Sequence, residues 1–202
     1  MTRSDVQLML DVKSGDEESF GILLHKYRSP MVNFLYRMVR DAATAEDLAQ
    51  EVFLRIYRAR KQYSPSAKFT TWLFRIATNL ALNSVRDNRH RQMDVSIDAP
   101  AEEDEAPMEL PAREMRIDEY MAERDRTAFI RNAISALPEK QRVAVLLHKY
   151  EEMDYGEIAR ILDCSESALK SLLFRAYETL RVQLAPLVAQ PVANPPGEGR
   201  PS

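Results

Sequence analysis

The stretch from Arg60 to Trp72 alternates basic side chains, aromatic rings and small hydroxyl groups over a short span. Single-stranded nucleic acid requires this mixture, because cations track the phosphates while aromatic rings accept unstacked bases. We interpret the stretch as a nucleic-acid-binding loop. Its candidate contacts are Arg60, Lys61, Tyr63, Lys68, Phe69 and Trp72. Core packing is the alternative for Phe69 and Trp72 taken alone.

A polar row continues from this loop along the helix that we predict to begin at Phe69. Four polar or basic residues follow close to i, i+4 spacing, which places them on one helical face. Amide side chains can address base edges, and cations can neutralise phosphates. The members of the row are Arg75, Asn79, Asn83 and Arg86.

A helix that precedes the loop carries a charged stripe with one large apolar residue beside it. We expect Thr44 to cap this helix, with Asp47 at the position of a capping-box acid. The stripe contains Asp47, Glu51 and Arg55, and Leu54 lies next to it. An apolar anchor among charges is typical of a protein-docking surface. An ordinary solvated face is the alternative.

The second half of the chain contains a short helix, a tight turn and a longer helix. Asp154 and Glu157 form a capping-box pattern before the short helix, and Ser165 can cap the long one. This order predicts a helix-turn-helix, in which the second helix enters the major groove of duplex DNA. The candidate contacts on its outer face are Ser167, Lys170, Ser171, Phe174 and Arg175.

Helical periodicity, only five glycines and no alternating β-branched run predict an all-α protein. We expect two small helical domains at 1–93 and 126–185, a flexible acidic linker at 94–125 that contains prolines, and a disordered tail at 186–202. We also expect Pro30 to start or kink a helix. The net charge of −3 conceals an acidic cluster between Asp94 and Leu110, outside two pieces with basic faces.

Several function classes are disfavoured. The sequence shows no nucleophile–base pair, no phosphate-cradling glycine loop and no metal-ligand cluster, so we predict no catalysis, cofactor or small-molecule substrate. Cys164 is the only cysteine, which fits a reducing compartment. No apolar segment is long enough to span a membrane. We therefore expect a cytoplasmic protein without membrane insertion.

These residues also carry a family resemblance. Two segments resemble conserved region 2 of bacterial RNA polymerase sigma factors: DLAQEVFLRIYRAR, from Asp47, and FTTWLFRIATNLALNSVR, from Phe69. Two more resemble region 4: LPEKQRVAVLLHKY and DYGEIARILDCSESALKSLLFRAYETLR. The likeness is to the small extracytoplasmic-function (ECF) class and covers nearly the whole chain. One departure is Glu166-Ser167-Ala168-Leu169, where the family usually has a Gly-Thr-Val-type sequence.

The resemblance implies a factor that binds core RNA polymerase, recognises minus-thirty-five and minus-ten promoter elements, melts DNA and directs transcription initiation. It implies docking on the β′ clamp helices through Asp47, Gln50, Glu51, Leu54 and Arg55. It further implies contact of the second domain with the β flap, inhibition by an anti-sigma factor, and a phosphate contact by His148. The alternative function is a stand-alone helix-turn-helix regulator, which would bind duplex DNA without polymerase.

Overall fold

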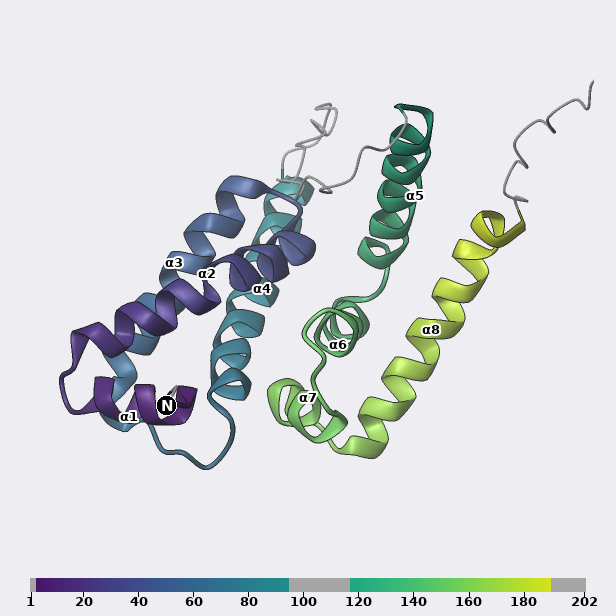
Figure 1. Cartoon of the computed structure of the whole chain (residues 1–202). Coiled ribbons are helices and arrows are strands. Elements are labelled where there is room, and N and C mark those ends of the chain that lie inside the picture. Colours follow the sequence, from purple (N-terminus) through teal and green to yellow (C-terminus); the bar gives the residue numbers. More distant parts are fainter. Residues whose placement is uncertain (1–2, 95–116, 190–202) are drawn as a thin grey trace, which may run out of the picture.

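The computed structural model describes residues 3–94 and 117–189, and this part of the chain contains helices and turns but no strand (Figure 1). The predicted all-α class is confirmed. The first domain consists of α1 (Asp5–Lys13), α2 (Glu17–Val39), α3 (Ala42–Ala59), the 3₁₀ turn η1 (Arg60–Gln62) and α4 (Phe69–Asp94). The second domain consists of α5 (Ile117–Ser135), α6 (Glu139–Lys149), α7 (Tyr155–Leu162) and α8 (Glu166–Ala189).

Helix α2 is one continuous helix, and this corrects the expectation that Pro30 starts or kinks a segment. Pro30 lies inside the helix, so the backbone loses one hydrogen bond there. Three large side chains soon after it, Met31, Phe34 and Leu35, are buried in the first domain. Their packing stabilises the helix on both sides of the proline.

The cap of α3 also differs from the expectation. The helix begins at Ala42, and Asp41 Oδ2 accepts a hydrogen bond from the Thr44 backbone N–H at 2.6 Å. Thr44 is therefore inside the first turn and is not the cap. Both residue types can cap a helix, and the earlier one does so here.

In the second domain the predicted caps are confirmed. The capping box of Asp154 and Glu157 is complete, and Ser165 Oγ accepts from the Ala168 N–H at 3.2 Å. The helix limits are wider than predicted. Helix α5 begins at Ile117, inside the expected linker, because no proline or glycine stands between Pro111 and Pro138.

Helix α8 runs past Ala185 and includes Pro186, which we expected to lie in the tail. The rest of the predicted linker (95–116) and of the predicted tail (190–202) lies outside the described residues. Within the described ranges, no helix is long and apolar enough to cross a membrane.

The two domains lie against each other. Helix α4 contacts α7, and α2 contacts α5 and α6. In Figure 1 helix α8 is on the side of the second domain that faces away from α4. The arrangement buries the side of α7 that faces the loop and leaves the outer face of α8 exposed.

Candidate docking groove and nucleic-acid interfaces

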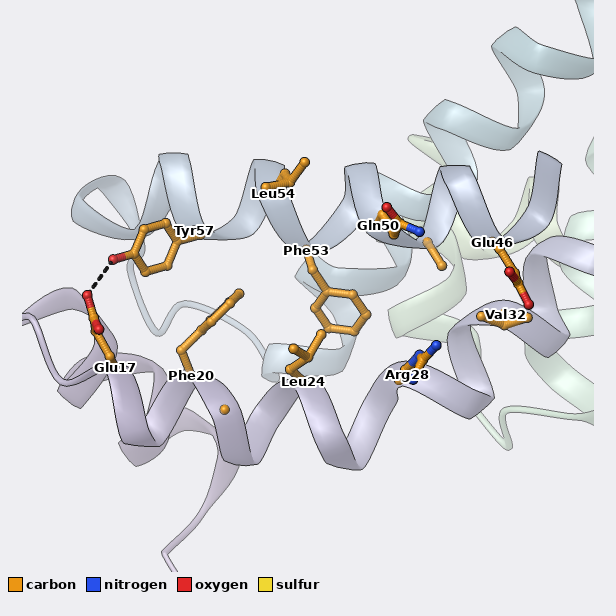
Figure 2. Close-up of a pocket in the computed structure, with 12 residues that line it drawn as sticks. Glu17, Phe20, Leu24, Arg28, Val32, Glu46, Gln50, Phe53, Leu54 and Tyr57 are labelled. Atoms are coloured by element: carbon orange, nitrogen blue, oxygen red, sulfur yellow. Dashed lines mark hydrogen bonds between the residues drawn. The ribbon is translucent and has the colours of Figure 1, made fainter. Parts of the chain in front are cut away.

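A groove of about 620 Å³ runs between α2 and α3 (Figure 2). Its interior is apolar, with Phe20 and Leu24 from α2 facing Phe53 from α3. One end is marked by Tyr57, whose hydroxyl donates to Glu17 Oε1 at 3.4 Å. The groove is long, apolar inside and polar at its ends, which suits an amphipathic helix of another protein.

Two of the predicted docking residues line this groove. Gln50 and Leu54 both belong to its wall, and Leu54 is 49% exposed although it is a large apolar residue. Beside them Arg55 Nε donates to Glu51 Oε1 at 2.7 Å. That hydrogen bond is the main reason why the pKa of Glu51 lies below its ordinary value. Asp47 is exposed on the same helix.

The aromatic residues of the loop are less accessible than predicted. Phe69 is buried, with its ring 5.6 Å from that of Tyr27, so its assignment as a surface stacking residue is wrong for this structure. Tyr63 is buried as well, and its ring lies 5.2 Å from that of Trp72. The first two helices pack under the loop: Lys13 Nζ donates to the Tyr63 carbonyl oxygen at 2.7 Å.

Tyr63 nevertheless lines a cavity of about 500 Å³ between the loop and α7. Its hydroxyl is buried and has no hydrogen-bond partner among the residues that the structure describes. Lys68, Trp72 and Arg75 line the same cavity from the first domain. The cavity therefore combines aromatic and cationic groups, as the sequence predicted for the loop.

The polar row on α4 is confirmed as an exposed face. Arg75, Asn79, Asn83 and Arg86 are all exposed. The two remaining loop cations differ from each other. Lys61 is exposed. Arg60 donates to the Tyr57 carbonyl oxygen at 2.7 Å and lies 4.0 Å from the centre of the Tyr57 ring.

The outer face of α8 is exposed as predicted. Phe174 is 68% exposed, and the rest of that face is also open to solvent: Ser167, Lys170, Ser171 and Arg175. His148, however, is half-buried on α6, and its Nδ1 lies 2.7 Å from the Tyr177 hydroxyl. This hydrogen bond occupies one side of the imidazole and positions His148 as part of the packing between α6 and α8.

Comparison with known proteins gives the family. Residues 23–91 match the profile of sigma-70 region 2, and residues 128–180 match that of sigma-70 region 4. The RNA polymerase sigma-H factor of Pseudomonas aeruginosa is 34% identical over 192 residues, which cover 92% of this chain and 96% of that protein. The chain belongs to the ECF class of the sigma-70 family. Sigma factor SigW of Bacillus subtilis, also an ECF factor, is 31% identical over 179 residues. The match covers 87% of this chain and 94% of SigW.

Two solved structures share the fold of this sigma factor. CnrH in complex with the cytosolic domain of CnrY aligns with a TM-score of 0.68 at 20% identity, over 91% of this chain and 99% of that one. RpoE of Bartonella quintana, in complex with the anti-sigma factor NepR, aligns with a TM-score of 0.64 at 20% identity, over 83% of this chain and 98% of that one.

The candidate binding surfaces of this sigma factor fall in two different regions of the family. Most of the groove and the whole α4 row fall within the region 2 match, and the α8 face falls within the region 4 match. The α2 half of the groove was missed from the sequence. Apolar periodicity places Phe20 and Leu24 on the inward face of their helix and gives no sign that they are only partly covered.

Proposed function

We propose that this sigma factor binds core RNA polymerase through the α2–α3 groove and reads promoter DNA with α4 and α8. The family assignment makes the chain a promoter-specific initiation factor. The half-exposed Leu54 at the wall of an apolar groove is the observation that supports this docking surface most directly. We place the protein in the bacterial cytoplasm, where it acts without a catalytic site of its own.

The proposed occupant of the groove is the helical clamp of the polymerase β′ subunit. The apolar interior would receive the apolar face of one clamp helix, as helix-in-groove recognition requires. The polar and charged residues of α3 would pair with the polar rim of the clamp. These residues are Asp47, Gln50, Glu51 and Arg55.

We propose that α4 captures the non-template strand of the minus-ten element. Asn79 and Asn83 offer amide donors and acceptors to base edges, while Arg75 and Arg86 neutralise phosphates. Extracting a base from the duplex costs a few kcal/mol, which stacking and amide contacts offset. Tyr63 would lie at the bottom of the pocket that receives the extracted base.

We propose that α8 reads the minus-thirty-five element in the major groove, while the second domain contacts the polymerase flap. Lys170 and Arg175 can contact phosphate or guanine, and Phe174 can meet a thymine methyl. Glu166 places a negative charge at the start of this helix, so it would disfavour close phosphate approach there. An anti-sigma factor is a further proposed partner, because both aligned relatives were solved with a binding protein.

The test is transcription by holoenzyme reconstituted from purified core polymerase on a randomised promoter library. We expect enrichment of a two-part motif that depends strictly on this chain. Asn79→Ala should reduce open-complex formation and leave core binding unchanged, because Asn79 is exposed on α4 and does not line the groove. Site-specific duplex binding without any core binding would favour the stand-alone regulator instead.

A further inference from the structure

The cavity between the loop and α7 has walls from both domains. Its volume of about 500 Å³ lies within the range of about 300–1,000 Å³ that is usual for small-molecule sites. The first domain supplies the loop and the first turns of α4. The second domain supplies Ala159, Arg160, Asp163 and Cys164, and these residues belong to none of the surfaces proposed above. One small ligand in this cavity can therefore contact both domains.

Part of the lining is aromatic. The rings of Tyr63 and Trp72 lie 5.2 Å apart and are inclined by 45° to each other, so they are not stacked face to face. Tyr63 is buried, whereas Trp72 is only half-buried. The accessible part of the indole offers a flat surface, and any nucleobase can stack on such a surface because every base has a π-face.

Two guanidinium groups line the cavity, one from each domain. Arg75 is exposed and forms no hydrogen bond or ion pair within the described part of the chain. Arg160 donates from Nε to the Gly156 carbonyl oxygen at 3.0 Å, and its two terminal nitrogens have no hydrogen-bond partner among the described residues. Guanidinium groups bind phosphate oxygens through paired N–H donors. The cavity therefore offers two cations to a phosphate group.

A carboxylate and two hydroxyl groups also line the cavity. Asp163 is exposed in the turn after α7, and its side chain has no hydrogen-bond partner within the described ranges. Ser64 and Ser66 belong to the loop. Dinucleotide-binding folds use a carboxylate to accept a hydrogen bond from a ribose hydroxyl. The cavity thus combines an aromatic, a cationic and an acidic group, which match the base, the phosphate and the ribose of a nucleotide.

The charges around the cavity favour a free nucleotide over a nucleic-acid strand. Lys68 also lines the cavity, but Glu157 accepts its hydrogen bond at 3.1 Å and accepts another from Thr71 at 3.2 Å. Asp154 Oδ2 lies 3.9 Å from the same Lys68 Nζ. A strand carries a phosphate on every nucleotide and would bring some of them against these carboxylates. A monophosphate carries one phosphate group, and the two arginines are enough to bind it.

We propose that this cavity binds a free ribonucleoside monophosphate, with its base on Trp72, its phosphate between Arg75 and Arg160, and a ribose hydroxyl on Asp163. The bound nucleotide would contact both domains and stabilise the chain by mass action. Trp72 and Arg75 also belong to the proposed minus-ten surface, whereas the groups from the second domain do not. The nucleotide site therefore does not depend on the role proposed for α4.

The chain carries two natural reporters at this cavity, one in each domain. Trp72 is the only tryptophan and Cys164 the only cysteine of the sequence, and both line the cavity. Titration of the full chain with adenosine monophosphate (AMP) should quench the tryptophan fluorescence to saturation, with a Kd on the order of 0.1 mM. The same occupancy should slow the reaction of Cys164 with a thiol reagent severalfold. Adenosine and ribose 5-phosphate each lack one part of the ligand and should bind about tenfold more weakly.

Arg160→Gln tests the phosphate contact from the second domain. The variant should bind AMP about fivefold to tenfold more weakly, because one charged hydrogen-bond donor is lost, and should bind adenosine as the wild type does. Arg181→Gln is the matched control, since it removes the same charge from α8 and Arg181 does not line the cavity. Cys164→Ser should abolish the thiol signal. Circular dichroism checks that each variant is folded.

Several outcomes would overturn the nucleotide site. One is the absence of saturable quenching by AMP at millimolar concentration, and another is an equal loss of affinity in Arg160→Gln and Arg181→Gln. Quenching without protection of Cys164 would place the nucleotide away from α7. Protection of Cys164 by a short single strand of DNA but not by AMP would assign the cavity to the strand instead. The role proposed for α4 is tested separately, since Asn79 does not line the cavity and Asn79→Ala should leave AMP binding unchanged.

Discussion

Truncation of Leu54 tests the docking groove with a predictable magnitude. Leu54 is 49% exposed, so about half of its side chain remains to be buried by a partner. Full burial of a leucine contributes about 1.5–3 kcal/mol, and half of that is roughly 1 kcal/mol. Leu54→Ala should therefore weaken core polymerase binding by about fivefold. Leu54→Asp should weaken it further, because a carboxylate would then be desolvated in the groove.

The assay is equilibrium binding of labelled chain to core polymerase, followed by fluorescence anisotropy. Ile22→Ala is the matched control, because Ile22 is 41% exposed on α2 and does not line the groove. Both variants should unfold within a degree or two of the wild type, since neither side chain belongs to the buried core. Equal losses of affinity for Leu54→Ala and Ile22→Ala would refute the groove as the docking surface. So would a loss for Leu54→Ala below twofold.

Three further predictions concern stability and DNA reading. Asp41→Ala removes the cap of α3 and should lower the free energy of unfolding by about 1 kcal/mol. Calorimetry should show this as a decrease of a few degrees in the unfolding temperature. The Thr44 hydrogen bond lowers the pKa of Asp41, so the extra stability of the wild type over Asp41→Ala should be present above the ordinary aspartate pKa. It should vanish as the pH falls through the lowered pKa. A stability difference that stays the same in acid would contradict this. Burial raises the pKa of Glu151 to about 7, so the folded chain binds the extra proton and wild-type stability should fall as the pH rises from about 4.5 to 7. Glu151→Gln should therefore raise the unfolding temperature at pH 8 but not at pH 4, and equal shifts at both would exclude a titrating Glu151. On minus-thirty-five duplex DNA, Lys170→Ala should weaken binding to all sequences and reduce the slope of log affinity against log salt concentration by about 1. Phe174→Ala should mainly reduce the preference for one base pair. The reverse pattern would assign the phosphate contact to Phe174 and the base contact to Lys170, and would contradict the proposal.

Helix positions were predictable from the sequence because apolar spacing and capping residues act locally. The capping box of Asp154 and Glu157 and the cap at Ser165 were both predicted correctly. Proline was misleading, since Pro30 and Pro186 are each inside a helix. Proline removes one hydrogen bond, and only the packing of the finished domain decides whether the helix continues through it.

The candidate site was predictable where exposure follows from helical periodicity. The α4 row and the α8 face are exposed as their spacing indicates. The buried ring of Phe69 was open to either interpretation, because its neighbour Tyr27 comes from a helix far away in the sequence. The contact between Lys68 and Glu157 joins residues 89 positions apart, and no local pattern encodes such a pairing.

The groove and the contact between the domains use different residues, although α2 contributes to both. The groove belongs to α2 and α3, whereas the contact between the domains joins the loop and α4 to α7, and the end of α2 to α5 and α6. Leu54 is accessible while Lys68 and Thr71 are held by Glu157. The proposed docking on polymerase therefore requires none of the groups that join the two domains. The two proposed surfaces can be tested apart for the same reason: a groove variant such as Leu54→Ala should lose core binding, whereas Asn79→Ala should keep core binding and lose open-complex formation.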